Sequence, residues 1–141
     1  MSAEENKERF RNFMEEVANR GNMAALDEFV ASDFVEREEL PPGAPPGRDA
    51  VEYFFTMVRT GFPDLQVTLD DVIAEGDKVV ARTTWRGAHR GEFMGIPPTG
   101  KTVAFTAIDI VRYAGGKMVE HWGQIDNLGL LQQLGVVPPA S

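Results

Sequence analysis

The chain has 141 residues, a formal net charge of −8 and no cysteine. The length predicts one domain, spanning residues 1–141, with a single hydrophobic core. The lack of cysteine excludes disulfides, a thiolate nucleophile and cysteine-ligated zinc, and it favours a compartment that is not oxidising.

Charge and hydropathy exclude two further classes of partner. Nucleic acids are bound by clustered Lys and Arg, which are scattered singly in this acidic chain, so we expect no nucleic-acid partner. The polar, acidic first residues do not read as a secretory signal or a transit peptide. No apolar run approaches the roughly 20 residues of a membrane span. We therefore expect a soluble, cytoplasmic protein with no membrane contact.

The first third of the chain has the apolar spacing of helices. One helix is predicted from about Glu4 to Arg20, because Gly21 suits the left-handed backbone position that follows a helix end. Its apolar residues at helical spacing are Phe10, Phe13, Met14 and Val17. A short second helix is expected after Asn22, whose side chain can cap it. The residues it would bring to the core are Leu26, Phe29 and Val30.

The middle of the chain contains a proline-rich run, residues 40–47, that cannot form a helix or an interior strand. We expect this run to be a surface connection. A third helix follows it and stops at Gly61. The apolar residues on one face of this helix are Val51, Phe54, Phe55 and Val58.

After Pro63 the apolar period changes from helical to two residues, which is typical of strands. The predicted strands are Leu65 to Ala74, Lys78 to Arg86, Lys101 to Tyr113 and Lys117 to Asp126. Tight turns at residues 75–77 and 114–116 join them as hairpins, so the sheet is expected to be antiparallel. Helices followed by a curled antiparallel sheet predict an α+β fold in which the sheet wraps the helices and leaves a pocket inside.

The connection from His89 to Lys101 is the most distinctive segment. Its glycines and prolines forbid regular structure, while Phe93, Met94 and Ile96 give it apolar content. The segment resembles the SnoaL-like polyketide cyclase family, whose members carry a His-x-Gly-Glu-x-x-Gly-x-x-Pro-Thr-Gly pattern. The resemblance continues through residues 116–122, Asp126 and residues 133–135.

The resemblance implies the cone-shaped fold of nuclear transport factor 2 and ketosteroid isomerase, and cofactor-independent ring closure by intramolecular aldol chemistry. In the resembling cyclases an acid–base Asp matches the position of Gly123, and a His matches Asp109. The chain therefore departs from the family at both positions. A carboxylate relocated to the neighbouring strand, at Asp109, is the expected replacement.

Asp109 is also singled out by alternation, because it is the charged residue on the face shared by Val103, Phe105, Ala107, Val111 and Tyr113. If this face lines the pocket, desolvation raises the pKa of the carboxyl and suits it to acid–base catalysis. A structural Asp satisfied by protein donors, or one facing solvent, is the alternative.

His121 is the predicted partner of Asp109, since the following hairpin strand brings it to a similar height. A satisfied core histidine is the alternative. Predicted substrate contacts are His89, Trp85, Phe105, Tyr113 and Phe54. His89 has a second interpretation, in which it anchors the loop by bonding to its backbone, and Phe54 a second one as plain core.

Other chemistry is excluded by missing patterns. No His-Glu-x-x-His spacing exists, so no metal site is predicted from the two histidines and a carboxylate. No serine lies in a nucleophile turn, and no glycine-rich phosphate loop follows a strand. No cofactor is expected. Asp126 is expected to cap the last helix rather than act as a base.

Two functional hypotheses remain. One is a cofactor-independent cyclase or isomerase acting on a small hydrophobic carbonyl compound through Asp109 and His121. The other is a non-catalytic module that binds a small hydrophobic ligand. We also expect a homodimer through the outer sheet face and the last helix, because apolar side chains lie on both. These are Ile108, Ile110, Trp122, Leu128, Leu131 and Leu134.

Overall fold

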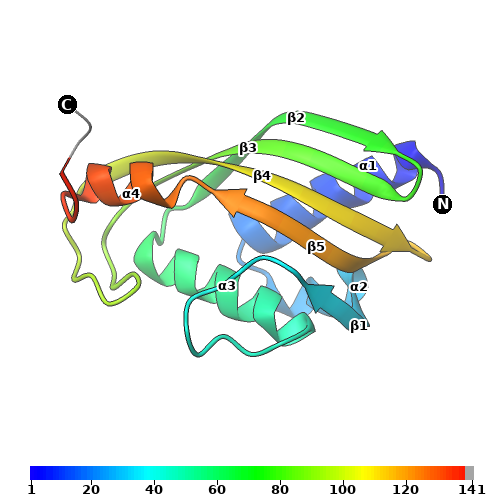
Figure 1. The fold of residues 1–141 in the computed structure, drawn as a ribbon, viewed down its shortest axis with the longest axis horizontal. Helices are drawn as coiled ribbons and strands as arrows, with labels where there is room; N and C mark the ends of the chain where they lie inside the picture. Colours follow the sequence, from blue (N-terminus) through cyan, green and yellow to red (C-terminus); the bar gives the residue numbers. More distant parts are fainter. Residues whose placement is uncertain (139–141) are drawn as a thin grey trace.

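The computed structural model describes residues 1–138, so the last three residues of the expected domain lie outside the described part. Its centre is a curled sheet of five strands in the order β1-β5-β4-β3-β2 (Figure 1). The strands are β1 Val30–Glu36, β2 Gln66–Glu75, β3 Lys78–Ala88, β4 Thr102–Ala114 and β5 Lys117–Ile125. The helices are α1 Ala3–Phe13, α2 Leu26–Phe29, α3 Arg48–Gly61 and α4 Asn127–Leu134. The predicted α+β class is confirmed.

The first predicted helix is present, in two forms. A capping box between Ser2 and Glu5 starts α1, and a π-helical segment, Met14–Asn19, continues it. The chain then turns at Gly21, whose φ is +70°. Asn22 precedes a short 3₁₀ turn, Met23–Ala25, but its side chain donates to Glu16 instead of capping the turn, so that expectation was wrong.

The strand β1 was not predicted, and it changes the sheet. Val30, which was assigned to a helix, begins this strand. The strand pairs with β5 in parallel, with Glu36 opposite His121. The sheet is therefore mixed rather than purely antiparallel. The remaining pairs, β2 with β3, β3 with β4 and β4 with β5, are antiparallel as expected.

A bulge near Val119 sets the register of β5. Tyr113 pairs with Met118, but Arg112 pairs with Glu120, so one residue is left over. As a result, Met118 is buried, whereas Val119 is only partly buried. Beyond the bulge, His121 lies opposite Val111 and Gly123 lies opposite Asp109.

The helices α1 and α3 cover the concave side of the sheet, and their apolar faces form the core (Figure 1). The proline-rich run 40–47 forms neither helix nor strand, as predicted. Asp126 accepts a hydrogen bond from the backbone N–H of Gly129 and caps α4, also as predicted. No helix within residues 1–138 is long and apolar enough to cross a membrane.

The loop from His89 to Lys101 is held by packing and by its histidine. Phe93 is buried and lies edge-on to Phe62, with ring centroids 5.2 Å apart. Gly91 is required there, because a Cβ at that position would overlap the carbonyl oxygen of Thr60.

Candidate active site

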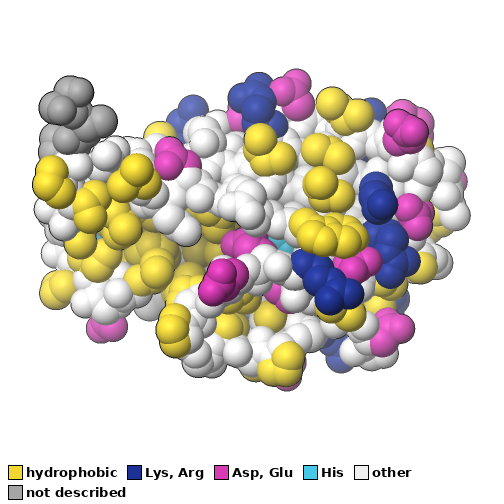
Figure 2. Space-filling model, viewed as in Figure 1, with side chains coloured by type: hydrophobic (Ala, Val, Ile, Leu, Met, Phe, Trp, Pro, Cys, Tyr) yellow, Lys and Arg dark blue, Asp and Glu magenta, His cyan; other side chains and the backbone are white. Residues whose placement is uncertain are grey.

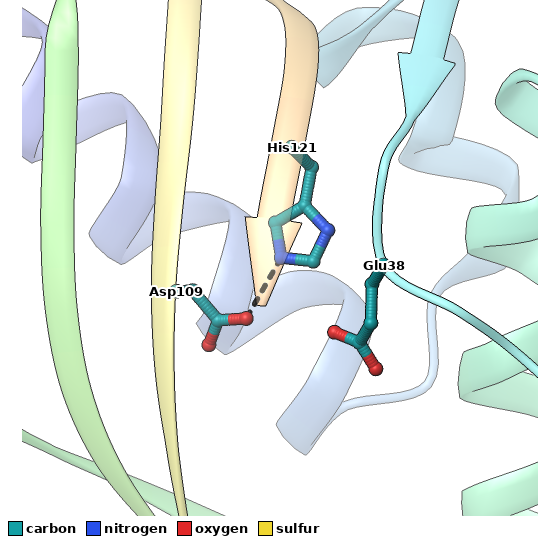
Figure 3. A group of neighbouring side chains, drawn as sticks. All are labelled: Glu38, Asp109 and His121. Carbon is teal, nitrogen blue, oxygen red and sulfur yellow. Dashed lines mark hydrogen bonds and ion pairs between the residues drawn. The ribbon is translucent and has the colours of Figure 1, made fainter. Parts of the chain in front are cut away.

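Three ionisable side chains, two from the sheet and one from the segment after β1, point into one space (Figure 3). Asp109 comes from β4 and His121 from β5, and Glu38 follows the end of β1. One carboxylate oxygen of each acid and a ring nitrogen of His121 lie within 4.8 Å of one another. A single small functional group can therefore contact all three side chains.

Both ring nitrogens of His121 contact carboxylates. Nε2 is 2.7 Å from Oδ1 of Asp109, and Nδ1 is 2.5 Å from Oε2 of Glu36. A neutral imidazole has one N–H, so two carboxylate acceptors favour the doubly protonated cation. Burial alone lowers the pKa of His121, but the hydrogen bonds that the ring donates to Asp109 and Glu36, and the charges of these carboxylates, outweigh burial and raise the pKa to about 10. The site thus holds an imidazolium between two carboxylates.

Because Gly123 has no side chain, the carboxyl groups of Glu38 and Asp109 can lie close together beside it. A Cβ at this position would overlap Oε1 of Glu38 and would lie 2.7 Å from Oδ1 of Asp109. The carboxyl groups of two other residues occupy this space, so the absence of a side chain here is a requirement of the site.

Glu38 has the most unusual environment of the acids. Burial raises the pKa of its carboxyl to about 7, with smaller raising effects from Asp109 and Glu36, while the charge of His121 opposes them. This carboxyl group therefore exists in both protonation states near neutral pH, which is the condition for acid–base work.

The charged cluster lies in the wall of an apolar cavity of about 600 Å³, a volume that includes the space at its opening to solvent. The cavity is otherwise lined mainly by aromatic and aliphatic side chains, and its charged residues are Glu36, Glu38, Asp109 and His121. Its aromatic residues are Phe10, Phe13, Phe34, Phe54, Phe55 and Trp85. On the face shown in Figure 2, acidic side chains and a small histidine surface lie beside a hollow with apolar walls.

The structure places some of the predicted substrate contacts in the cavity and others outside it. Trp85 and Phe54 line the cavity, with ring centroids 5.8 Å apart. Phe105 stacks on Trp85 and lines an adjoining pocket that also includes Glu38 and Phe54. Tyr113 does not line this cavity. It lies in a separate pocket with Asn6, and burial raises the pKa of its hydroxyl.

His89 is also away from the cavity, so the expectation of a substrate contact does not fit its position. It is fully buried at the end of β3, and its Nδ1 accepts a hydrogen bond from the backbone N–H of Thr99 at 3.2 Å. The alternative interpretation, anchoring of the loop, matches these contacts.

His89 is not near His121, so the two histidines cannot share a metal ion. The cluster around His121 is better suited to holding protons than to binding a metal. Glu38, Asp109 and His121 offer a possible set of three cation ligands. However, a metal-bound imidazole must lose the proton of the coordinating nitrogen. Nε2 of His121 uses that proton to bond Asp109, and the raised pKa of the ring holds it there.

Sequence reasoning missed Glu36 and Glu38. They belong to the stretch Glu36-Arg37-Glu38-Glu39, which reads as a solvated charge run at the end of an element. Its only signal is the two-residue spacing of Glu36 and Glu38, and this spacing becomes informative once β1 is known.

Comparison with known proteins agrees with this geometry. A sequence profile described as SnoaL-like polyketide cyclase matches residues 8–134. The chain belongs to the SnoaL-like polyketide cyclase family. The resemblance seen in the loop from His89 to Lys101 is thereby confirmed.

Relatives within the SnoaL-like family include named enzymes. The nogalonic acid methyl ester cyclase of Streptomyces nogalater is 29% identical over 119 residues, which cover 83% of this chain and 88% of that enzyme. An aklanonic acid methyl ester cyclase of Streptomyces peucetius is 30% identical over 112 residues, covering 74% and 77% of the two chains. The solved structure of TsrD from Streptomyces laurentii has a TM-score of 0.86 at 29% identity, covering 97% of this chain and 99% of TsrD.

Proposed function

We propose that this protein is a cofactor-independent cyclase or isomerase that moves a proton at a carbon next to a carbonyl group. The observation that carries the proposal is the 2.7 Å contact between Asp109 and His121 inside an apolar cavity. A carboxylate and an imidazolium in a water-poor space are the two groups that enolate chemistry requires.

In the proposed reaction Asp109 removes the proton from carbon, and negative charge develops on the carbonyl oxygen. The positive charge of His121 stabilises that oxyanion, because the ring is already protonated near neutral pH. Glu36 holds the ring in place through Nδ1. The surrounding apolar side chains strengthen these interactions by excluding water.

The proposed substrate is a small hydrophobic polyketide ester. Two of the relatives are named as cyclases of nogalonic and aklanonic acid methyl esters, which makes these compounds suitable first tests. The cavity is lined mainly by apolar side chains with a few polar groups, which is the usual make-up of a small-molecule site. Trp85 and Phe54 contribute aromatic side chains to the wall that a planar ring would contact.

Two further expectations are part of the proposal. The absence of cysteine supports a cytoplasmic protein. Ile108 and Leu128 are more than half exposed, which supports a homodimer through the outer sheet face and α4. Leu134, which was also expected on that surface, is buried in the core and does not belong to it. A monomeric mass at micromolar concentration in light scattering would argue against the dimer.

The test uses both methyl esters with EDTA present and no cofactor added. Replacement of Asp109 by Asn keeps the size of the side chain and removes the base. We expect the turnover rate to fall by about 10²–10⁴-fold while KM stays within roughly tenfold. Asp33→Asn makes the same change on the exposed side of β1 and is the matched control. Full turnover by Asp109→Asn, or binding of the esters without any turnover by the unaltered protein, would contradict the proposal.

A further inference from the structure

Of the three acidic residues that line the cavity, Glu38 is the one that does not bond to His121. Glu36 and Asp109 each bond one nitrogen of His121. Within residues 1–138 no hydrogen bond or ion pair reaches the Glu38 carboxylate. Its side chain nevertheless points into the cluster, and its Oε1 fills the space that Gly123 leaves beside Asp109 (Figure 3). A half-buried carboxyl group without a fixed partner is free to bond whatever enters the cavity.

Ring closure of the kind proposed above requires two proton transfers. The C–H bond next to one carbonyl breaks, a C–C bond forms to the second carbonyl carbon, and the second carbonyl oxygen becomes an alkoxide that must gain a proton. No oxidant or reductant takes part, and product and substrate have the same atoms. A base at the carbon and an acid at the oxygen perform the two transfers without either group having to move between the two atoms.

We propose that Glu38 is the general acid of this site, donating its carboxyl proton to the alkoxide oxygen while Asp109 takes the proton from carbon. This assignment rests on the cyclase function proposed above. The reacting oxygens of Glu38 and Asp109 and the nitrogen of His121 lie within 4.8 Å of one another, so both atoms of the substrate fit against them at once. After turnover Asp109 holds the proton that Glu38 lost, and one bridging water can return it over this distance.

The surroundings of Glu38 favour its acid form. Burial is the largest cause that raises the pKa of this carboxyl to about 7. The charged groups that face it are Glu36 from β1, Asp109 from β4 and the imidazolium of His121 from β5, while α1 and α3 contribute only apolar side chains to the cavity. The charges of Asp109 and Glu36 raise the pKa of Glu38, and the charge of His121 lowers it. Burial therefore decides the direction of the shift.

The first experiment needs no substrate. The protein is labelled with ¹³C at the glutamate carboxyl carbons, and Glu38→Gln identifies the signal of Glu38. We expect this signal to titrate with a midpoint near pH 7. A midpoint near the ordinary value of 4.5 overturns the assignment whichever substrate the protein uses.

The second experiment measures turnover of nogalonic acid methyl ester against pH. For the unaltered protein we expect kcat to decline as the pH rises through about 7, because the acid form of Glu38 is lost. We expect Glu38→Gln to lower kcat by about 10²-fold, to remove this decline and to leave KM within a few-fold. Glu38→Asp keeps a carboxyl group, so a slower enzyme that retains the decline is expected. The control is Glu75→Gln, at the exposed end of β2.

Deuterium exchange distinguishes the role of Asp109 from that of Glu38. In D₂O, Glu38→Gln should still exchange the enolisable C–H of the ester, because Asp109 is intact, whereas Asp109→Asn should not. No turnover or exchange by the unaltered protein would overturn the cyclase function and this role together. Turnover by Glu38→Gln at the rate of Glu75→Gln would overturn the role of Glu38 alone.

Discussion

Protonation of His121 should set the alkaline limit of stability. The pKa of this ring is 6.5 in an unperturbed histidine and about 10 in the folded protein, because the hydrogen bonds and charges of Asp109 and Glu36 outweigh burial, which lowers it. The folded protein therefore holds the proton more tightly than the unfolded chain does. The resulting stabilisation is complete below about pH 6.5 and is lost as the pH rises through about 10. At about 1.4 kcal/mol for each pKa unit, the loss amounts to at most about 5 kcal/mol.

The assay is urea unfolding at a series of pH values from 6 to 10.5, for the unaltered protein and for His121→Gln. Lysines and tyrosines titrate similarly in both proteins, so the difference between them isolates the ring of His121. We expect His121→Gln to be less stable by about 3–5 kcal/mol at pH 6, since it leaves two buried carboxylates unpaired, and to lack the decline above pH 6.5. Long-range ¹H–¹⁵N spectra should show both nitrogens of His121 protonated at pH 8. A neutral ring at pH 8, or a constant free energy of unfolding from pH 6.5 to 10, would refute the reasoning.

Three further changes test other parts of the structure. Gly123→Ala should shift the unfolding free energy by less than about 2 kcal/mol, since the gain of a strand Cβ offsets overpacking, yet it should abolish turnover by displacing Glu38 and Asp109. Wild-type turnover would contradict this view of Gly123. Asp126→Ala should cost about 1 kcal/mol of stability in urea unfolding through loss of the α4 cap, with turnover retained. An unchanged denaturation midpoint would show that the cap is unimportant. Ile108→Glu should convert the proposed dimer to a monomer in light scattering, and an unchanged mass would exclude Ile108 from the interface.

The parts of the fold that follow a local period were predictable. Alternation along β4 identified its inward face, and helical spacing identified α1 and α3. The strand β1 was missed because its only buried residues are Val30 and Phe34, four positions apart, which is the spacing of a helix. Its extended form is supported by pairing with β5, which no local pattern reports.

Of the site, only the residues on the alternating strands β4 and β5 were predictable. The pair Asp109 and His121 followed from two alternating strands joined by a hairpin. Uniform counting from the turn would set Trp122 opposite Asp109, however, and the bulge at Val119 sets Gly123 there instead. Glu36 and Glu38 could not be found without β1, because their two-residue spacing is informative only once the pairing of β1 with β5 is known.

The parallel pairing of β1 with β5 has a consequence for how the protein acquires its chemistry. Glu36 and His121 are separated by 85 positions in the chain, so their contact closes one of the largest loops in the molecule. Hairpins between neighbouring strands are local and form early, whereas contacts of high sequence separation are slow to form. A folding intermediate can therefore contain β2 to β5 and still lack the carboxylate that holds the imidazole. Catalytic competence should appear only with the last docking event, after most of the secondary structure has formed.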